Sequence, residues 1–403
     1  MTDLKELLTA ISDHAGVFDV TERAFVLGRR RRTRQRVAFA GATTALAVTA
    51  LLVAVNLPAG PAPEPAIPPS PSASLPAVAL SACTVANLPL PDGVRKEQSG
   101  VSGDHTGRIL ASRLRDDRGD VLVVWADGQP AGVVRWPDEA AEISAVGPTG
   151  IVLMAAEQGT GGAREKSATW VYRDGTVTRL RGKGALGRGV NAAGAIVGLI
   201  SDNQPVVWPD ATAEPVPLPV PDGMTAADPM GIADDGTVVG QLFQGRHGPK
   251  PAYQYGRPGW GYVWPPGGSP EQLSVPDKGP GAGATQSRAF GVVDGWAAGN
   301  IQTLKGPSEP VRWNLATGEV ELIEGAERVT PHGWSIFRNG RSLTLVRGDV
   351  EVPLPGPPGY PSPSVGGGSG RTYVYVISPD GRALAGMQDD GPARLALLRW
   401  TCR

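Results

Sequence analysis

The sequence contains few of the residues that carry chemistry in enzymes and metal sites. Its 403 residues include four histidines and two cysteines. His105, His247 and His332 lie far apart, with neither HExxH spacing nor a neighbouring cysteine, so the pattern predicts no metal site. A GxSxG elbow and a phosphate loop are also missing, and residues 182–187 match GxGxxG without a helix pattern after them. The sequence therefore favours a protein without catalytic activity and without a cofactor.

An excess of charge of one sign is missing as well. The formal net charge is -1, whereas nucleic-acid-binding domains carry a basic surface, so we expect no nucleic acid as a partner. Arginines cluster at residues 29–36, directly before an uncharged apolar run, Val37–Leu57. As a helix this run would be about 31 Å long, which matches a hydrocarbon core of about 30 Å. It predicts one membrane-spanning helix, with residues 1–36 in the cytoplasm and the rest of the chain extracellular. A cleaved signal peptide is the alternative.

The segments on either side of the predicted span differ in composition. Residues 1–36 place Leu4, Leu7 and Ile11 at helical spacing, which predicts a short amphipathic helix in a cytoplasmic tail. This helix would either lie on lipid or bind a cytoplasmic regulatory protein. Residues 58–82 are rich in proline, alanine and serine, a composition typical of polyproline II. We expect a stalk that extends up to about 75 Å from the bilayer.

Glycine and proline are abundant, with 55 and 39 residues, and this composition favours many short strands. From residue 83 onward a pattern recurs about every forty residues: a turn glycine, an alternating apolar strand, a variable loop, and an apolar run that ends in tryptophan. The turn glycines are Gly107, Gly150, Gly194, Gly236, Gly295, Gly333 or Gly340, and Gly381. The tryptophans are Trp125, Trp170, Trp208, Trp264, Trp313 and Trp400, with Leu345 in the sixth unit.

This period, with four expected strands in each unit, predicts an all-β fold. Radial repetition of four-stranded units is typical of β-propellers. We expect a propeller of about seven blades over residues 83–403, and six to eight blades are compatible with the pattern. The tryptophans should pack between blades rather than take part in chemistry.

The two ends of the predicted propeller complement each other. The chain stops shortly after Trp400, so the last unit lacks a fourth strand of its own. Residues 85–93 copy the fourth-strand ending at residues 216–223, which predicts that the first strand completes the last blade. Cys83 and Cys402 then lie at one seam, outside the cytoplasm, where disulfides persist. We expect a disulfide between them.

Several units resemble a known family of repeats. Residues 189–198 (GVNAAGAIVG), 231–240 (GIADDGTVVG) and 167–180 (SATWVYRDGTVTRL) resemble the extracellular HAF repeats of bacterial exported proteins. Units of that family read Ala-Ile-Asn-x-x-Gly-x-Val-Val-Gly and His-Ala-Phe-x-Trp-x-x-Gly. Here Ser167-Ala168-Thr169 replaces the His-Ala-Phe segment, and the first and sixth units depart from the pattern. The resemblance implies an exported, propeller-like repeat domain and no defined activity.

The loops between second and third strands vary most, and binding residues usually lie on variable loops of a rigid scaffold. Three insertions stand out, at residues 157–167, 244–261 and 300–310. Their arginines and aromatic residues are the types enriched at binding hot spots, and they suit sugars or anionic polymers. The predicted ligand-binding residues are Arg164, Lys166, Arg246, His247, Tyr253, Tyr255, Arg257 and Trp260.

Three functional interpretations follow. The leading one is a membrane-anchored, extracytoplasmic binding or sensing propeller whose ligand is a cell-envelope glycan or protein. The second is an anti-sigma-like regulator that acts through residues 1–36. The third is a propeller enzyme, a glycosidase or a quinone-dependent dehydrogenase, suggested by the Trp-to-Thr-Gly turn at residues 313–318.

Overall fold

Seven four-stranded antiparallel sheets account for the described part of the chain. The computed structural model describes residues 79–95, 100–157, 166–244, 259–276, 281–303, 308–340, 342–357, 371–389 and 395–403. The predicted tail (1–36), the predicted span (37–57) and residues 58–78 of the predicted stalk lie outside these ranges. Within them, no helix is long and apolar enough to cross a membrane.

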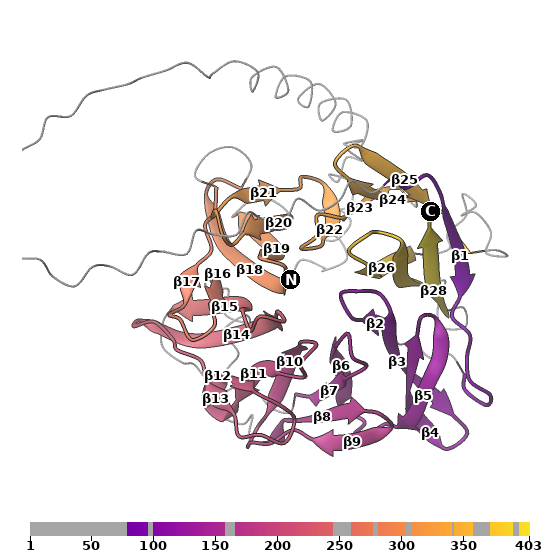
Figure 1. Cartoon of the computed structure of the whole chain (residues 1–403), viewed down its shortest axis with the longest axis horizontal. Coiled ribbons are helices and arrows are strands. Elements are labelled where there is room, and N and C mark those ends of the chain that lie inside the picture. The colour runs from indigo at the N-terminus through magenta and orange to yellow at the C-terminus, as the bar shows by residue number, and fades with distance from the viewer. Residues whose placement is uncertain are drawn as a thin grey trace, which may run out of the picture. The chain divides into compact units, whose positions relative to one another are not determined.

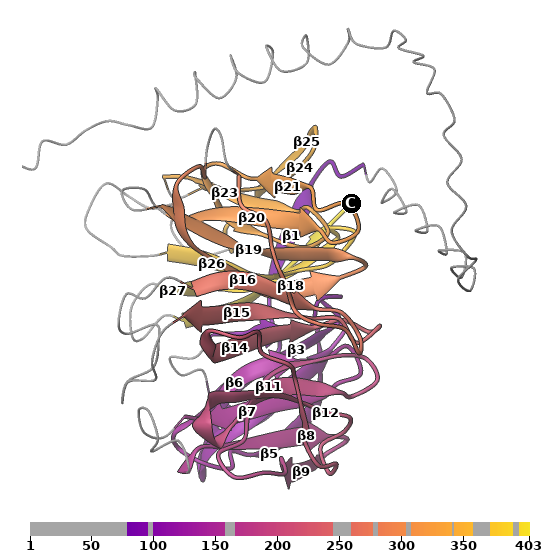
Figure 2. The same cartoon turned by 90° about the vertical axis from the view of Figure 1, so that its left-hand side faces the viewer.

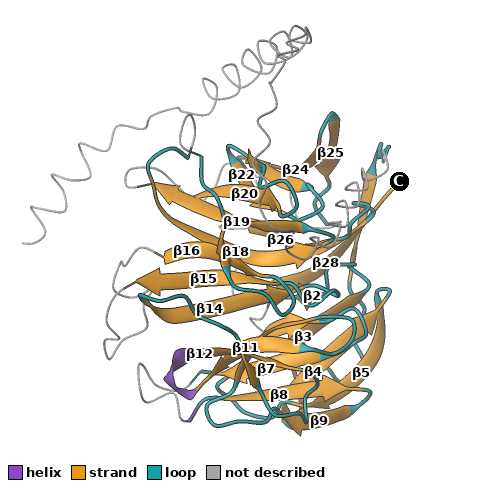
Figure 3. Cartoon of the chain, turned by 60° about the vertical axis from the view of Figure 1, so that its left-hand side comes forward, coloured by secondary structure: helices purple, strands orange, loops and turns teal. Residues whose placement is uncertain are grey.

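The first four sheets, or blades, follow the chain in order. Blade 1 comprises β2 (Ser102–Gly103), β3 (Ile109–Asp116), β4 (Gly119–Ala126) and β5 (Gln129–Arg135). Blade 2 comprises β6 (Ala141–Val146), β7 (Val152–Ala156), β8 (Ala168–Arg173) and β9 (Thr176–Arg179). Blade 3 comprises β10 (Leu186–Val190), β11 (Ile196–Ile200), β12 (Gln204–Trp208) and β13 (Val216–Pro217), with a short 3₁₀ segment, η2 (Ser201–Asn203), before β12 (Figure 3). Blade 4 comprises β14 (Met224–Ile232), β15 (Val238–Gln244), β16 (Gly259–Trp264) and β17 (Glu271–Gln272).

The last three blades include the one that closes the ring. Blade 5 comprises β18 (Ala284–Val293), β19 (Trp296–Thr303), β20 (Ser308–Asn314) and β21 (Val320–Leu322). Blade 6 comprises β22 (Ala326–Val329), β23 (Ser335–Asn339), β24 (Ser342–Arg347) and β25 (Val350–Leu354). Blade 7 comprises β26 (Arg371–Ile377), β27 (Ala383–Asp389), β28 (Leu395–Cys402) and β1 (Cys83–Asn87).

The blades stand around a central axis, with the first strand of each unit innermost (Figure 1). The inner strands of neighbouring blades contact each other directly from β26 through β2, β6, β10 and β14 to β18. The antiparallel order within a blade places two kinds of connection on opposite faces of the ring. The turn face carries the tight first-to-second turns, such as residues 191–194. The loop face carries the second-to-third connections, such as residues 157–167, and the links between blades. The C terminus lies on the turn face, at the right in Figure 2.

The predicted closure of the ring is confirmed. β1 pairs antiparallel with β28, and Cys83 lies opposite Cys402 in this register. The two cysteines form a disulfide, with Cα atoms 4.0 Å apart. The first strand of the domain is therefore the outermost strand of the last blade, and about seven blades in the prediction become seven in the structure.

Turn chemistry explains the recurring Asn-Ala-Ala-Gly and Ala-Asp-Asp-Gly segments. Gly194 adopts a φ of 88°, a left-handed conformation that glycine reaches without strain. Its N–H donates to the carbonyl of Asn191 at 3.1 Å, which closes a tight turn between β10 and β11. The buried Asn191 amide donates to the carbonyl of Ala233 in blade 4, at 3.0 Å. The same turn residues therefore shape one blade and link it to the next.

Tryptophans link five of the seven blades to the connection before them. Five third-strand indoles are buried and donate their N–H groups at 2.7 to 2.9 Å to backbone carbonyls. The pairs are Trp125 with Pro89, Trp208 with Arg181, Trp264 with Pro219, Trp313 with Ser274, and Trp400 with Pro355. Buried indole N–H groups need such a partner. The tryptophans therefore pack at the blade interfaces, as expected.

Two units depart from the predicted tryptophan position. Blade 3 defines the position: Trp208 pairs with Ile196, the second residue after the turn glycine Gly194. The equivalent partner in blade 2 is Tyr172, and Trp170 lies two residues earlier and is half-buried. In blade 6 the equivalent residue is Val346 rather than Leu345. Leu345 points to the other side of its sheet, since side chains alternate along a strand.

Candidate ligand-binding cavity

Most of the predicted ligand-binding residues lie outside the described ranges, namely Arg164, Arg246, His247, Tyr253, Tyr255 and Arg257. Lys166 is described and exposed, directly before β8 of blade 2. Trp260 belongs to β16 of blade 4, where it pairs with Leu242 and packs against the cluster around Trp264. Trp260 is therefore a strand residue rather than part of a loop.

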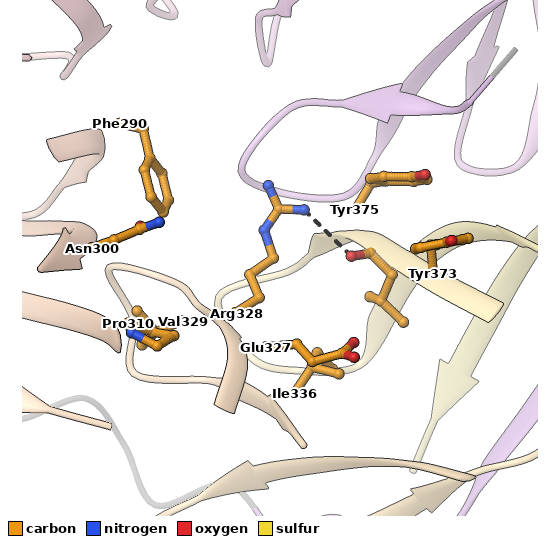
Figure 4. A pocket seen from close by; sticks show the side chains of 10 residues that line it. Phe290, Asn300, Pro310, Glu327, Arg328, Val329, Ile336, Tyr373 and Tyr375 are labelled. Atoms are coloured by element: carbon orange, nitrogen blue, oxygen red, sulfur yellow. Dashed lines mark hydrogen bonds between the residues drawn. The ribbon is translucent and has the colours of Figure 1, made fainter. Parts of the chain in front are cut away.

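The insertion predicted at residues 300–310 is also largely strand. Asn300 lies in β19 and Pro310 lies in β20, and the two residues pair with each other. Both face a cavity of about 260 Å³ that is partly open to solvent and lies among blades 5, 6 and 7 (Figure 4). The cavity is lined by Phe290, Asn300, Pro310, Glu327, Arg328, Val329, Ile336, Tyr373, Val374 and Tyr375.

The cavity lies beside a short inner strand, β22 of blade 6. β22 has four residues, whereas the inner strands β14 and β18 have nine and ten, and β2 of blade 1 has two. Only residues 323–325 join β21 to β22, and the N–H of Ile323 donates to the carbonyl of Pro310 at 2.9 Å. This short link holds β22 against β20 of blade 5. Residues of blades 5 and 7 line the cavity beside this link.

Repeated β-bulges supply several of the lining side chains. Six inner strands carry an extra, unpaired residue near the turn face: Ser144, Arg188, Met230, Phe290, Glu327 and Tyr375. A bulge locally increases the twist of a strand and redirects the side chain of the extra residue. Phe290, Glu327 and Tyr375 come from three neighbouring blades and line the same cavity. The repeat thus presents one such side chain from each of six blades.

Arg328 is the cation of the cavity. Its guanidinium projects between Phe290 and Tyr375, and one N–H group donates to the carbonyl of Val374 at 3.3 Å (Figure 4). Among the residues that the structure describes, no carboxylate pairs with Arg328. Burial lowers the pKa of Arg328 below its usual value, but a guanidinium stays protonated in proteins. The remaining N–H donors of this positive charge are available to a ligand.

Glu327, the neighbouring carboxylate, forms ion pairs with two other arginines. Its side chain accepts from Arg338 at 2.9 Å and from Arg371 at 3.2 Å. Burial alone would raise the pKa of Glu327. The hydrogen bonds and charges of Arg338 and Arg371 outweigh burial, so the pKa lies below its usual value. Arg338 also donates to the carbonyl of Thr372 at 2.6 Å, which links blade 6 to blade 7.

The other inner-strand arginines are paired, in contrast to Arg328. Arg188 lies 3.1 Å from Glu157 and 3.8 Å from Asp228. Arg288 lies 3.2 Å from the same Asp228. These ion pairs join blades 2 to 5 around the axis. The charge of Arg328 is therefore an exception among the inner strands rather than a general property of them.

Aromatic rings form the side of the cavity that blade 7 contributes. Tyr373 and Tyr375 stack with ring centroids 6.1 Å apart and an interplanar angle of 13°. The guanidinium of Arg371 lies 5.3 Å from the centroid of Tyr373. Burial raises the pKa of the Tyr375 hydroxyl above its usual value, so the hydroxyl is protonated at neutral pH and can donate. The cavity combines flat apolar surfaces, one available cation and several hydrogen-bonding groups.

Comparison with known proteins assigns no family to the chain. No protein-family model and no curated protein matches the chain. Many solved structures are similar to it, and three of them serve as examples. The first is the β-propeller domain of the Trilobed protease from Pyrococcus furiosus, at 14% identity and a TM-score of 0.47, covering 76% of this chain and 96% of that chain.

The second solved structure is YCF48 bound to D1 peptide, at 12% identity and a TM-score of 0.42, covering 81% of this chain and 97% of that chain. The third is TolB from Acinetobacter baumannii, at 11% identity and a TM-score of 0.38, covering 77% and 65%. The chain is a seven-bladed β-propeller. At these identities the likeness carries nothing about ligands or activity.

Proposed function

We propose that this protein is a membrane-anchored, extracytoplasmic binding or sensing propeller. It holds a small anionic group of a cell-envelope ligand in the cavity among blades 5, 6 and 7. The proposal rests on one observation, the half-buried guanidinium of Arg328, which faces a cavity and has no carboxylate partner among the described residues. No catalytic step is part of the proposal.

The physical argument concerns the cost of an unpaired charge. Burying an ionised group is unfavourable unless an opposite charge or several hydrogen bonds compensate. One backbone carbonyl supplies part of that compensation to Arg328. A bound anion would supply the rest, and the favourable pairing would appear only in the complex. Such a site sacrifices some stability of the free protein for affinity.

The membrane anchor and the external loops remain proposals from the sequence. Val37–Leu57 would anchor the chain, and the loop residues with Arg164, Lys166 and Tyr253 would contact parts of the ligand outside the cavity. Protease added to intact cells should cut between residues 58 and 82 and release a large soluble fragment. A chain that is fully protected in intact cells would contradict this topology.

Binding can be tested with the full chain in detergent micelles, applied to isolated envelopes of the cells that make it. Arg328→Gln should reduce the retained fraction at least tenfold. Arg288→Gln is the matched control, because it removes an equal charge from an inner strand whose arginine is paired with Asp228. Thermal unfolding of both variants checks that the fold is kept. Equal retention of Arg328→Gln and the parent would refute a site at this cavity.

A further inference from the structure

We infer that the ligand group in the cavity is a single carboxylated sugar ring, of the uronic acid type, whose carboxylate pairs with Arg328 while its ring lies against the aromatic side chains. This inference rests on the proposed function and adds the chemical class of the ligand. It draws on the donor geometry of Arg328, the size of the cavity, and the surfaces that surround the guanidinium.

The donor geometry of Arg328 favours a carboxylate. A guanidinium presents its N–H groups in a planar fork that matches the two oxygens of a carboxylate. The bond to Val374 at 3.3 Å uses one N–H group and links β22 to β26, which orients the fork. Figure 4 shows this guanidinium directed into the space between Phe290 and Tyr375. A bidentate contact therefore needs little rearrangement of the protein.

The balance of charge favours a monoanion. Arg328 contributes a single positive charge without a carboxylate partner in the described chain, and Glu327 contributes a nearby negative charge. The positive charges of Arg338 and Arg371 are already engaged by Glu327. A carboxylate carries one negative charge, whereas a phosphate monoester carries between about 1.5 and 2 at pH 7. Three guanidinium groups and one carboxylate leave a net charge of +2, but among the described residues only Arg328 lacks a carboxylate partner, so the second charge of a phosphate would have to compete with Glu327 for Arg338 or Arg371.

The size of the cavity favours one ring rather than a chain. Sites for drug-sized ligands occupy roughly 300 to 1,000 Å³. A cavity of about 260 Å³ falls just below that range, so it accommodates one six-membered ring with its substituents. The cavity is partly open to solvent, which leaves an exit for the rest of a polymer attached to that ring.

The surrounding side chains suit a sugar. The face of an aromatic ring carries partial negative charge, and it attracts the polarised C–H groups on the flat side of a pyranose. Tyr373, Tyr375 and Phe290 supply such faces on two sides of the cavity. The amide of Asn300 and the hydroxyl of Tyr375 can hydrogen-bond to sugar hydroxyls. A peptide carboxyl terminus would share the Arg328 contact but would not need these paired polar and aromatic groups.

Direct binding to small probes tests the ligand class. The full chain, in a detergent without a sugar headgroup, is titrated with glucuronate, glucose and N-acetylalanine, and binding is followed by ligand-observed NMR. Glucuronate should bind at least tenfold more tightly than either other probe. Arg328→Gln should abolish this preference, Arg328→Lys should restore part of it, and Arg288→Gln should leave it unchanged. Tyr373→Leu should weaken glucuronate binding while keeping the preference for charge.

The possible outcomes separate this inference from the proposed function. If glucuronate binds no better than glucose, or N-acetylalanine binds best, the sugar acid is refuted. If Arg328→Gln nevertheless loses retention on envelopes, the proposed binding site stands with another ligand. If glucuronate binds through Arg328 but envelope retention does not depend on Arg328, the ligand class holds and the envelope function fails.

Discussion

Removal of the disulfide between Cys83 and Cys402 should release the outermost strand of blade 7 without unfolding the other blades. The bond closes a loop with a sequence separation of 319 residues. In the chain-entropy model, a cross-link over a loop of this length stabilises by roughly 5 to 6 kcal/mol. That figure applies to the fully unfolded chain. For local release of β1 in the Cys83→Ser/Cys402→Ser variant, the contacts of β1 alone must offset the conformational entropy of ordering its five residues, roughly 5 to 10 kcal/mol.

The contacts of β1 are of a similar size to that entropy. The strand itself is mostly exposed, with a single edge paired to β28. Its most deeply buried apolar anchors are the flanking residues Leu80 and Leu88, which are 9% and 2% exposed, while Val85 is partly buried against the same core. Burial of two leucines stabilises by roughly 3 to 6 kcal/mol. The free energy of docking β1 onto β28 should therefore be close to zero without the disulfide, and we expect local opening.

Hydrogen exchange measures this opening directly. Amides of β28 should exchange at least a hundredfold faster in the double variant, whereas amides of β11 in blade 3 should keep the protection of the parent. Reducing agent should reproduce the effect in the parent and have none in the variant, which serves as the control. Unchanged protection of β28 would show that β1 is held by its own contacts and would refute this energy comparison.

Three further predictions concern single side chains at blade interfaces. Trp208→Phe should lower the free energy of unfolding by about 2 to 3 kcal/mol in urea titrations, because it removes buried volume and the 2.8 Å bond to Arg181. Trp170→Phe, at a half-buried residue, should cost less than about 1 kcal/mol, and equal losses would contradict the role given to the indole N–H. His332 is 4% exposed, its Nε2 has no partner within the described residues, and burial lowers its pKa to about 4. Stability should therefore be highest above pH 6.5 and should fall by up to about 3 kcal/mol as the pH drops to 4. His332→Gln should flatten that part of the profile, and an unchanged slope would be evidence against it. Asn191→Ala should cost about 2 kcal/mol in thermal unfolding because it removes the 3.0 Å bond between blades 3 and 4, and a neutral effect would show that the link is not needed.

Much of the fold could be predicted because its determinants are local and repeated. A glycine with positive φ, such as Gly194, marks each tight turn at a defined distance from the next strand. The closing strand was predictable because residues 85–93 copy the fourth strand of another unit. These signals fix the number and order of strands. They do not require knowledge of any contact between distant residues.

The errors arose where the register of a strand had to be predicted. Trp170 and Tyr172 point to the same face and differ only in their position along β8. The recurrence of tryptophan in the other units therefore led to the prediction of Trp170 at a position that Tyr172 occupies. Leu345 and Val346 are adjacent and point to opposite faces, and the choice depends on how β24 pairs with β23. Register is a property of two strands, which a pattern in one segment does not contain.

The candidate site was not predicted because it departs from the repeat. Arg328 stands in an ordinary polar segment of the sequence, and no motif distinguishes it from an exposed arginine. The available signal was the short spacing between the fourth strand of blade 5 and the turn Gly333. That spacing leaves room for only three linking residues and a four-residue inner strand. It predicts a short inner strand in blade 6.

Ring closure explains why the cavity beside β22 is not closed by movement of the neighbouring blades. In an open stack of sheets, blades 5 and 7 could move together and fill the space next to a short β22. Here blade 7 is fastened to the start of the domain through β1, and Trp400 ties it to Pro355 at 2.9 Å. Arg338 further fixes the distance between blades 6 and 7 through Thr372. The contacts that close the ring therefore also keep Arg328 accessible.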